Sequence, residues 1–245
     1  MASLEGRACA VTGASSGIGR ALTIALARSG AHVVAVARSQ ERLDSLALEA
    51  GGPGTIFPLV ADLADDEGLD SAASGILARA DRLDVLVHSA GTIHLEGLAS
   101  ATASELDRQY AVNLRAPVAL TRALLPALER ARGQVVFVNS SAALRASANN
   151  VLYAVTKAGL KAFADGLRDA VNRDGIRVLT VYVGRTATPM QAHVHESEGR
   201  PYRAELLLRP EDVAESVVSA LILPSSGELT ELSIRPMSKL PEGTS

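Results

Sequence analysis

A tyrosine and a lysine four residues apart form the pair in this sequence best suited to proton transfer. Tyr153 and Lys157 stand in "NNVLYAVTKAGLKAF", residues 149–163, at the start of a helical pattern. Residues at this spacing lie one turn apart on the same face of a helix. A free tyrosine has a pKa near ~10, and a nearby ammonium group lowers that pKa. The pair could therefore work as an acid–base device, although taken alone it could equally be two residues on a helix surface.

A glycine-rich turn near the N-terminus is suited to binding a phosphate. In "VTGASSGIGR", residues 11–20, Gly13, Gly17 and Gly19 lie between an expected strand and an expected helix. Glycines allow a tight turn and close approach of the backbone, and the helix N-terminus presents free N–H groups. A glycine pattern alone is also typical of connections that bind nothing. Its place after the first strand and before the first helix favours a phosphate site.

Alternating strands and helices must position these residues. We expect strands over 7–13, 31–37, 55–62, 83–91, 134–141 and 176–184, with a candidate last strand over 228–236. We expect helices over 18–30, 40–50, 152–172 and 209–222, and a long helical region from after residue 91 to about 131. This alternation predicts an α/β protein with a doubly wound parallel sheet of about seven strands and helices on both faces. We expect one domain over 1–245, with Pro58 marking an irregular or edge strand.

The segment 185–209 interrupts the alternation. It is polar and contains two prolines. Long excursions of this kind are often lids or binding loops, so we expect a substrate loop here. Met190 and Tyr202 indicate some apolar contact with a substrate. The tail 237–245 is expected to be frayed.

The composition excludes several classes of protein. The 245 residues carry a formal net charge of −3, which provides no electrostatic footprint for nucleic acid or an anionic membrane. The single cysteine, Cys9, lies in an apolar run and is interpreted as a core residue, which fits a reducing compartment. There is no signal-peptide pattern and no apolar run of ~18 residues. These features predict a cytoplasmic protein without nucleic-acid or membrane partners.

A short histidine cluster raises the question of a metal. His193, His195 and Glu196 occur in "HVHE". Two histidines two residues apart, without a supporting cysteine or third histidine, indicate exposed or substrate-loop residues more than ligands. We therefore predict no metal site.

Six segments carry the pattern along almost the whole chain. They are "TGASSGIG" (12–19), "LVHSAG" (86–91), "YAVNLRAP" (110–117), "VVFVNSS" (135–141), "YAVTK" (153–157) and "VGRTATPM" (183–190). Together and in this order they resemble the short-chain dehydrogenase/reductase family. The resemblance implies a Rossmann-like fold and an oxidoreductase that transfers a hydride between a nicotinamide dinucleotide and a carbonyl or secondary alcohol. It also favours a working Tyr153–Lys157 pair over two surface residues.

The resemblance implies a cofactor site built from several of these segments. It places Asp62 and Leu63 beside the adenine, Ala90 and Gly91 along the adenosine, and threonines after residue 184 near the nicotinamide and phosphates. The expected cofactor-binding residues are Gly13, Ser15, Ser16, Gly17, Ile18, Gly19, Arg38, Asp62, Leu63, Ala90, Gly91, Tyr153, Lys157, Gly184, Thr186 and Thr188.

The end of the second strand bears on the choice of dinucleotide. An acidic residue there binds the ribose 2′-hydroxyl of NAD, whereas an arginine pairs with the 2′-phosphate of NADP. This chain has Arg38 followed by Ser39 and no acidic residue. NADP(H) is therefore favoured over NAD(H). The other basic position common in the family, inside the glycine loop, is occupied by Ser16.

The resemblance also implies a catalytic set of Asn113, Ser140, Tyr153 and Lys157. Tyr153 would be the general acid in reduction and the base in oxidation. The serine would bind the substrate oxygen and stabilise developing charge. The family spacing of thirteen residues from serine to tyrosine favours Ser140, with Ser141 as the alternative. Asn113 would hold a water near the lysine and complete a proton relay.

Two motifs depart from the family pattern. His88 and Ser89 stand where the family commonly has two asparagines, and Val183 replaces a proline before Gly184. Both motifs are structural or lie on the cofactor side in the family, so the departures concern local geometry.

The sequence predicts an NADP(H)-dependent enzyme acting on a small carbonyl or alcohol. The alternative is a catalytically idle dinucleotide-binding regulator of the same fold. The resemblance implies a homodimer or homotetramer, and the absence of a glycine-rich C-terminal ending favours the dimer.

Overall fold

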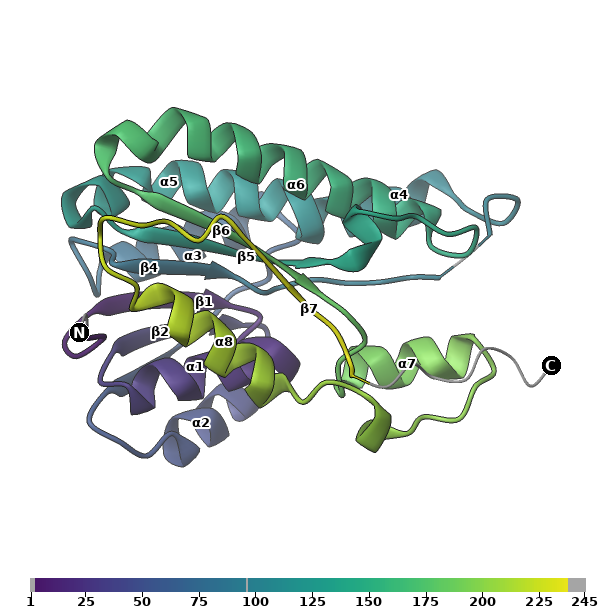
Figure 1. Ribbon diagram of the computed structural model, residues 1–245, viewed down its shortest axis with the longest axis horizontal. Coiled ribbons are helices and arrows are strands. Elements are labelled where there is room, and N and C mark those ends of the chain that lie inside the picture. Colours follow the sequence, from purple (N-terminus) through teal and green to yellow (C-terminus); the bar gives the residue numbers. More distant parts are fainter. Residues whose placement is uncertain (1–2, 96, 238–245) are drawn as a thin grey trace.

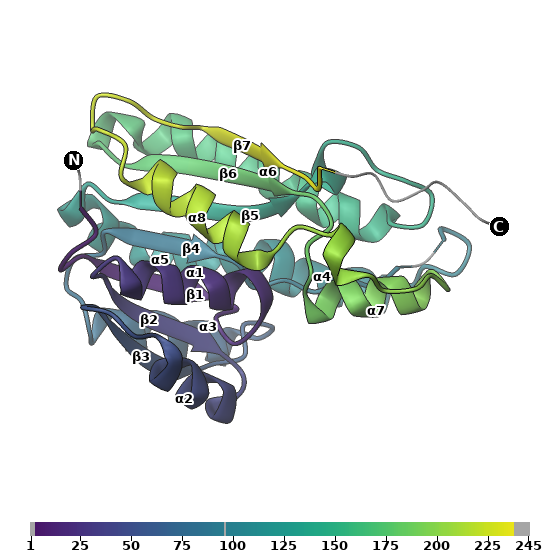
Figure 2. The ribbon, with the colours of Figure 1, turned by 60° about the horizontal axis from the view of Figure 1, so that its bottom comes forward.

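A computed structural model describes residues 3–95 and 97–237 of the chain. In this part, seven parallel strands form one sheet in the order β3-β2-β1-β4-β5-β6-β7, side by side in Figure 2. The strands are β1 (Ala8–Thr12), β2 (His32–Ala37), β3 (Thr55–Val60), β4 (Val85–His88), β5 (Gln134–Ser140), β6 (Arg177–Val183) and β7 (Glu231–Ile234). The sheet order reverses between β1 and β4, and such a switch point is where open α/β sheets bind ligands.

Helices cover both faces of the sheet, which confirms the doubly wound fold (Figure 1). Helices α1 (Gly17–Arg28), α2 (Gln40–Glu49) and α8 (Pro210–Leu221) cover one face. Helices α3 (Asp66–Leu77), α5 (Ala116–Ala131) and α6 (Val151–Val171) cover the other. Helix α4 (Ala103–Tyr110) contacts α6, and α7 (Pro189–Ser197) lies apart from both layers, at the right of Figure 1.

The pleat of the strands divides the core into two layers. In β1, Cys9 and Val11 pack toward α1, whereas Ala10 packs toward the opposite helices. Successive side chains of a strand point to opposite faces, so a strand covered on both sides must be apolar throughout. Cys9 is 1% exposed, and burial raises the pKa of its thiol, so the thiol stays protonated. This matches its interpretation as a core residue.

Several predicted elements differ from the structure. Residues 63–82 had no predicted element but contain α3, whose Asp65 caps it by accepting a hydrogen bond from the Gly68 N–H. The expected long helical region begins only at Ala103, and residues 92–95 and 97–102 are not helical. Segment 185–209 is not wholly irregular, since Thr188 caps α7 and Pro189 begins it. Residues 238–245 of the expected frayed tail lie outside the described residues.

The edge position of Pro58 is confirmed. Pro58 lies in β3, which pairs only with β2 and ends the sheet. An edge strand tolerates proline because the missing N–H need not face a second neighbour.

Among the described residues, no helix combines the length and the apolar character needed to cross a bilayer.

Candidate active site

Two cavities meet along the glycine loop at the carboxyl ends of the strands. One, of about 370 Å³, is lined by Ser140, Tyr153 and Lys157 together with residues of α7. The other, of about 740 Å³, is lined by residues after β2 and β3, including Arg38. Gly13, Ser16, Ala90 and Gly91 line both. The two cavities could therefore accommodate the two ends of one extended ligand.

The glycine loop has the shape expected of a phosphate cradle. Gly13 has a φ of +68°, and a Cβ there would lie 2.8 Å from the Ala90 Cα. A Cβ at Gly19 would lie 2.3 Å from the Gly13 carbonyl oxygen, far inside contact distance. No side chain caps the first turn of α1 at Ser16, and that turn has no acidic residue. Its N–H groups are therefore available to an anion, as the dipole of the helix favours.

Thr12 is a positioning residue that the sequence analysis missed. Its hydroxyl accepts hydrogen bonds from the Ser89 N–H at 3.1 Å and the Ala90 N–H at 3.2 Å. These bonds join the end of β1 to the segment after β4, which forms the wall between the two cavities. Its position between a buried strand and Gly13 was the available signal.

Asn139 ties the serine of β5 to the lysine of α6. Its side-chain Oδ1 accepts from the Ser140 N–H at 2.8 Å, and its Nδ2 donates to the Lys157 carbonyl at 3.1 Å. Asn139 is 3% exposed. The Ser140 hydroxyl in turn accepts from the Ala142 N–H at 3.1 Å, whereas exposed Ser141 begins the following 3₁₀ turn. Hydrogen bonds through both its N–H and its hydroxyl therefore fix the position of Ser140.

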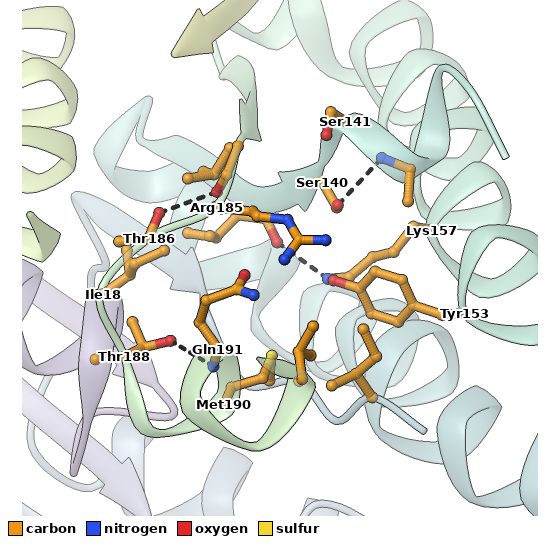
Figure 3. A pocket seen from close by; sticks show the side chains of 18 of the residues that line it. Ile18, Ser140, Ser141, Tyr153, Lys157, Arg185, Thr186, Thr188, Met190 and Gln191 are labelled. Atoms are coloured by element: carbon orange, nitrogen blue, oxygen red, sulfur yellow. Dashed lines mark hydrogen bonds between the residues drawn. The ribbon is translucent and has the colours of Figure 1, made fainter. Parts of the chain in front are cut away.

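Tyr153 and Lys157 lie in the first turns of α6 and face the same cavity as Ser140 (Figure 3). The Lys157 Nζ lies 5.8 Å from the centroid of the Tyr153 ring and donates to the Val138 carbonyl at 3.2 Å. Burial lowers the pKa of Lys157 to about 8. The i, i+4 spacing has therefore brought the two side chains together as predicted.

The pKa of Tyr153 is shifted in the direction opposite to the expected one. Burial raises it to about 12, and hydrogen bonding with the Ser140 side chain acts only partly against this. Withdrawal from water disfavours the phenolate, and this effect outweighs the neighbouring groups in the protein alone. Tyr153 is therefore protonated at neutral pH.

Asn113 lies beneath the site and lines neither cavity. It occupies a π-helical turn, Ala111–Arg115, between α4 and α5. Its Oδ1 accepts from the Thr92 N–H at 2.8 Å, and its Nδ2 donates to the Thr92 carbonyl and the Thr156 hydroxyl. The side-chain amide is thus occupied by the protein itself, and it fastens the segment after β4 to α6.

The residues expected around the adenosine line the larger cavity. Arg38 is exposed at the end of β2 and forms no ion pair with a described side chain. Asp62, Leu63 and Ser15 border the same cavity. Arg108 and Arg115 of the α4–α5 region line it as well and were not predicted, since nothing local in the sequence joins them to this edge.

The segment after β6 closes the smaller cavity. Gly184, Thr186 and Thr188 line it as expected. A Cβ at Gly17 would lie 2.9 Å from the Thr188 Cγ2, which places this threonine over the glycine loop. The wall also contains residues that the sequence analysis did not select, namely Ile93, Leu95, Arg145, Arg185, Gln191 and Glu198.

Helix α7 corrects two expectations about the substrate loop. His195 is not an exposed residue, because it is 1% exposed and its Nδ1 is hydrogen-bonded to the Gln191 carbonyl at 2.8 Å. Tyr202 does not line either cavity, and its ring instead packs edge-on against His195 at 5.5 Å. Met190 lines the smaller cavity as expected. Within residues 3–95 and 97–237, no three His, Cys, Asp or Glu side chains gather as metal ligands would.

The motif departures are accommodated locally. The His88 ring stacks on Phe137 at 5.1 Å, and its Nε2 shares a 2.9 Å hydrogen bond with the Thr121 hydroxyl. Burial lowers the pKa of His88 to about 3, so the ring is neutral. Val183 is a buried β6 residue that pairs with Ser140. His88 thus joins β4 to β5 and α5, and Val183 is part of the pairing between β5 and β6.

Comparison with known proteins agrees with this geometry. The model of the short chain dehydrogenase family matches residues 7–199. An uncharacterized short-chain type dehydrogenase/reductase of Sinorhizobium fredii is 33% identical over 238 residues, or 95% of this chain and 92% of the relative. A 3-oxoacyl-(acyl-carrier-protein) reductase of Thermotoga maritima is 32% identical over 221 residues, or 88% and 90% of the two chains.

A solved structure covers nearly the whole chain. The alcohol dehydrogenase of the archaeon Thermococcus sibiricus, complexed with 5-hydroxy-NADP, has a TM-score of 0.86 and 27% identity. The match covers 98% of this chain and 100% of that one. With a parallel sheet, a glycine loop and a serine, tyrosine and lysine around one cavity, the chain belongs to the short-chain dehydrogenase family.

Proposed function

We propose that this protein is an NADP(H)-dependent oxidoreductase that interconverts a carbonyl compound and a secondary alcohol. The observation that carries the proposal is one cavity lined by Ser140, Tyr153 and Lys157 and continuous with the glycine loop. Similarity to a 3-oxoacyl reductase and to an alcohol dehydrogenase supports the same reaction class. The tight turn at Gly13 and Gly19, where any Cβ would collide with neighbouring backbone, and the uncapped first turn of α1 fit a dinucleotide pyrophosphate.

The side chains of the smaller cavity can perform the proton transfer. A bound NADP(H) would supply or accept the hydride. The Ser140 hydroxyl would hold the substrate oxygen, and the Tyr153 hydroxyl would donate a proton to it during reduction. The Lys157 ammonium would stabilise the phenolate that remains and hold the cofactor ribose. Asn139 would keep the serine and the lysine at their places through its two hydrogen bonds.

At neutral pH Tyr153 holds the proton that reduction requires. A group with a pKa of about 12 is an available acid at pH 7, and the phenolate needed for oxidation forms only as the pH rises. A positive charge on an oxidised nicotinamide would lower that pKa and assist the reverse reaction.

Turnover with a carbonyl panel tests the proposed function. The purified protein with NADPH, and separately with NADH, should consume reduced nucleotide when simple ketones and aldehydes are added. Tight binding of nucleotide without turnover of any panel member would instead favour a dinucleotide-binding regulator.

Arg38→Ala is expected to weaken NADPH binding and leave NADH binding unchanged. Arg38 lines the adenosine-side cavity and is unpaired among the described side chains, so its guanidinium is free to bind a 2′-phosphate. Removal of one charge-assisted contact should raise the NADPH dissociation constant roughly ten- to hundredfold. Calorimetric titration with both nucleotides measures this. Arg42→Ala, at an exposed arginine of α2 outside both cavities, is the matched control. Equal weakening of both nucleotides would contradict a role in selecting NADP.

Ser140→Ala should lower kcat/KM far more than Ser141→Ala. We assign the substrate-binding role to Ser140, because its side chain is the one that hydrogen bonding couples to the Tyr153 phenol. Loss of a donor aimed at developing charge typically costs about a hundredfold or more. Steady-state kinetics on both variants with one ketone decides between the two serines, and a larger loss in Ser141→Ala would reverse the assignment.

A further inference from the structure

An ion pair forms part of the wall of the smaller cavity. Arg185 lies two residues after Val183, the last residue of β6, and Glu198 directly follows Ser197, the last residue of α7. The Arg185 Nη1 donates to Glu198 Oε2 at 2.8 Å, and its Nη2 donates to Oε1 at 2.6 Å. Both residues line the same cavity as Ser140 and Tyr153. In Figure 3 the Arg185 guanidinium extends from its strand end into this cavity, toward the side on which Ser140 and Tyr153 stand.

The Arg185 guanidinium is fixed in position, but not all of its hydrogen-bond donors are occupied. It has five N–H donors, and the contact with Glu198 occupies one on each terminal nitrogen. The Nε–H and the second N–H of each terminal nitrogen have no partner among the described residues, and the side chain is 33% exposed. A planar guanidinium whose two terminal nitrogens are already hydrogen-bonded loses little conformational entropy when it donates a further hydrogen bond. Arg185 therefore offers preorganised donors to a ligand in the cavity.

The pair presents these donors without a net charge. Burial raises the pKa of Glu198, but hydrogen bonding and charge from Arg185 outweigh it, and the resulting pKa is below its usual range. Glu198 is therefore ionised and neutralises Arg185. A substrate carboxylate would meet the Glu198 carboxylate beside the guanidinium, whereas a hydroxyl or carbonyl oxygen would not. An apolar substituent would displace water from the remaining Arg185 N–H groups and offer them no acceptor, so binding of such a substrate is disfavoured.

We propose that Arg185, held by Glu198, determines specificity for carbonyl substrates that carry a second, uncharged oxygen group close to the reacting carbonyl. The second oxygen is a hydroxyl or carbonyl that accepts from the guanidinium, while the reacting oxygen lies at Ser140 and Tyr153. This inference rests on the proposed function and adds the substrate class to it.

Four compounds with the same carbon skeleton test this selectivity. Butanone has one oxygen, acetoin and diacetyl add an uncharged second oxygen, and α-ketobutyrate adds a carboxylate. The measured quantity is kcat/KM for each compound, as the ratio of variant to parent, so differences in intrinsic reactivity of the ketones cancel. Arg185→Leu should lower kcat/KM for acetoin and diacetyl roughly ten- to hundredfold while butanone changes little.

Two further variants keep the test decisive. Glu198→Gln retains the guanidinium but removes the carboxylate, so it should raise kcat/KM for α-ketobutyrate relative to diacetyl. This variant tests the inference if Arg185→Leu does not fold. Arg209→Leu breaks the exposed Arg209–Asp212 pair outside the cavity and should leave all four ratios near one. Thermal unfolding of each variant reports whether it is folded.

The outcomes separate the inference from the proposed function. If Arg185→Leu lowers kcat/KM for all four compounds by the same factor, or leaves the ratio of kcat/KM for diacetyl to that for butanone unchanged, the inference is overturned and the proposed function stands. If the parent protein reduces other members of the carbonyl panel but none of these four compounds, the inference alone is overturned, and if it reduces no member of the panel, both are overturned. Preferential loss of α-ketobutyrate in Arg185→Leu would overturn the inference in favour of an anion-binding arginine.

Discussion

Tyr153→Phe is expected to lower kcat roughly hundred- to ten-thousand-fold, the range typical of a positioned general acid. The substitution removes only the phenol oxygen. The ring remains in place, 9% exposed, packed with Ala142 and Ala154 beneath the cavity. NADPH binding should persist, because the glycine loop and Arg38 are untouched. Pre-steady-state and steady-state reduction of one accepted ketone, together with a calorimetric titration of NADPH, measures both quantities.

Tyr182→Phe is the matched control for that experiment. Tyr182 is as deeply buried, at 2% exposed, and its hydroxyl donates to Glu231 at 2.9 Å. It lines neither cavity. Loss of its hydrogen bond should cost about 1 kcal/mol of stability and leave kcat near that of the parent. Turnover of Tyr153→Phe close to the parent value would show that another group provides the proton.

Lys157→Met is expected to stop turnover and at the same time to stabilise the folded protein at neutral pH. The variant keeps the length of the side chain but removes the ammonium that would stabilise the Tyr153 phenolate and hold the cofactor ribose, so kcat should fall at least about a hundredfold. Lys157 is 4% exposed, and burial lowers its pKa from 10.5 to about 8. Burial of the charged form therefore destabilises the fold, and methionine removes that cost.

The destabilisation by Lys157 becomes smaller as the pH rises. Between pH 8 and 10.5 the unfolded chain binds more protons at Lys157 than the folded chain does, so this group makes stability rise with pH. Below pH 8 the cost is fully present. The shift corresponds to a gain on the order of 3 kcal/mol for Lys157→Met there, reduced by the lost hydrogen bond to the Val138 carbonyl.

Urea unfolding of parent and variant at several pH values measures this difference directly. The free energy of unfolding of Lys157→Met should exceed that of the parent at pH 7, and the gap should close as the pH approaches 10. Tyr153 does not disturb this comparison, because its pKa of about 12 keeps it protonated in the folded protein over this pH range. A variant less stable than the parent at pH 7 would mean that the contacts of the ammonium outweigh its desolvation.

Local patterns were sufficient for most of the fold. The alternation of apolar runs and helical segments predicted the parallel sheet because a strand buried on both faces must be largely apolar, as β1 is from Ala8 to Val11 and β2 from Val33 to Ala37. Helix α3 escaped prediction since its buried face consists of the small or isolated residues Leu69, Ala72, Ala73 and Ile76, interrupted by Gly68 and Gly75. Helix α7 escaped because its sequence is largely polar and begins with a proline, and its Thr188 cap was assigned only to the cofactor.

Part of the candidate site could likewise be predicted from local patterns, and part could not. Ser140, Tyr153, Lys157 and the glycine loop could be selected from the sequence, because their chemistry depends on residue type and short spacing. Asn139 and Arg185 could not, since their partners Lys157 and Glu198 lie 18 and 13 residues away. The water-holding role of Asn113 stays a prediction, and what only the structure shows is that its side-chain amide is hydrogen-bonded to Thr92 and Thr156.

By itself the sequence determined which groups could carry the chemistry: a tyrosine and a lysine one helical turn apart, a serine at a strand end and a turn that only glycines can form. The tertiary structure alone decided the state of those groups. Burial raises the pKa of Tyr153 and lowers that of Lys157, and the fold pairs Arg185, after β6, with Glu198, after α7. The reason is physical. Residue type and spacing act along the chain, whereas desolvation and ion pairing depend on which distant segments exclude water from the same place.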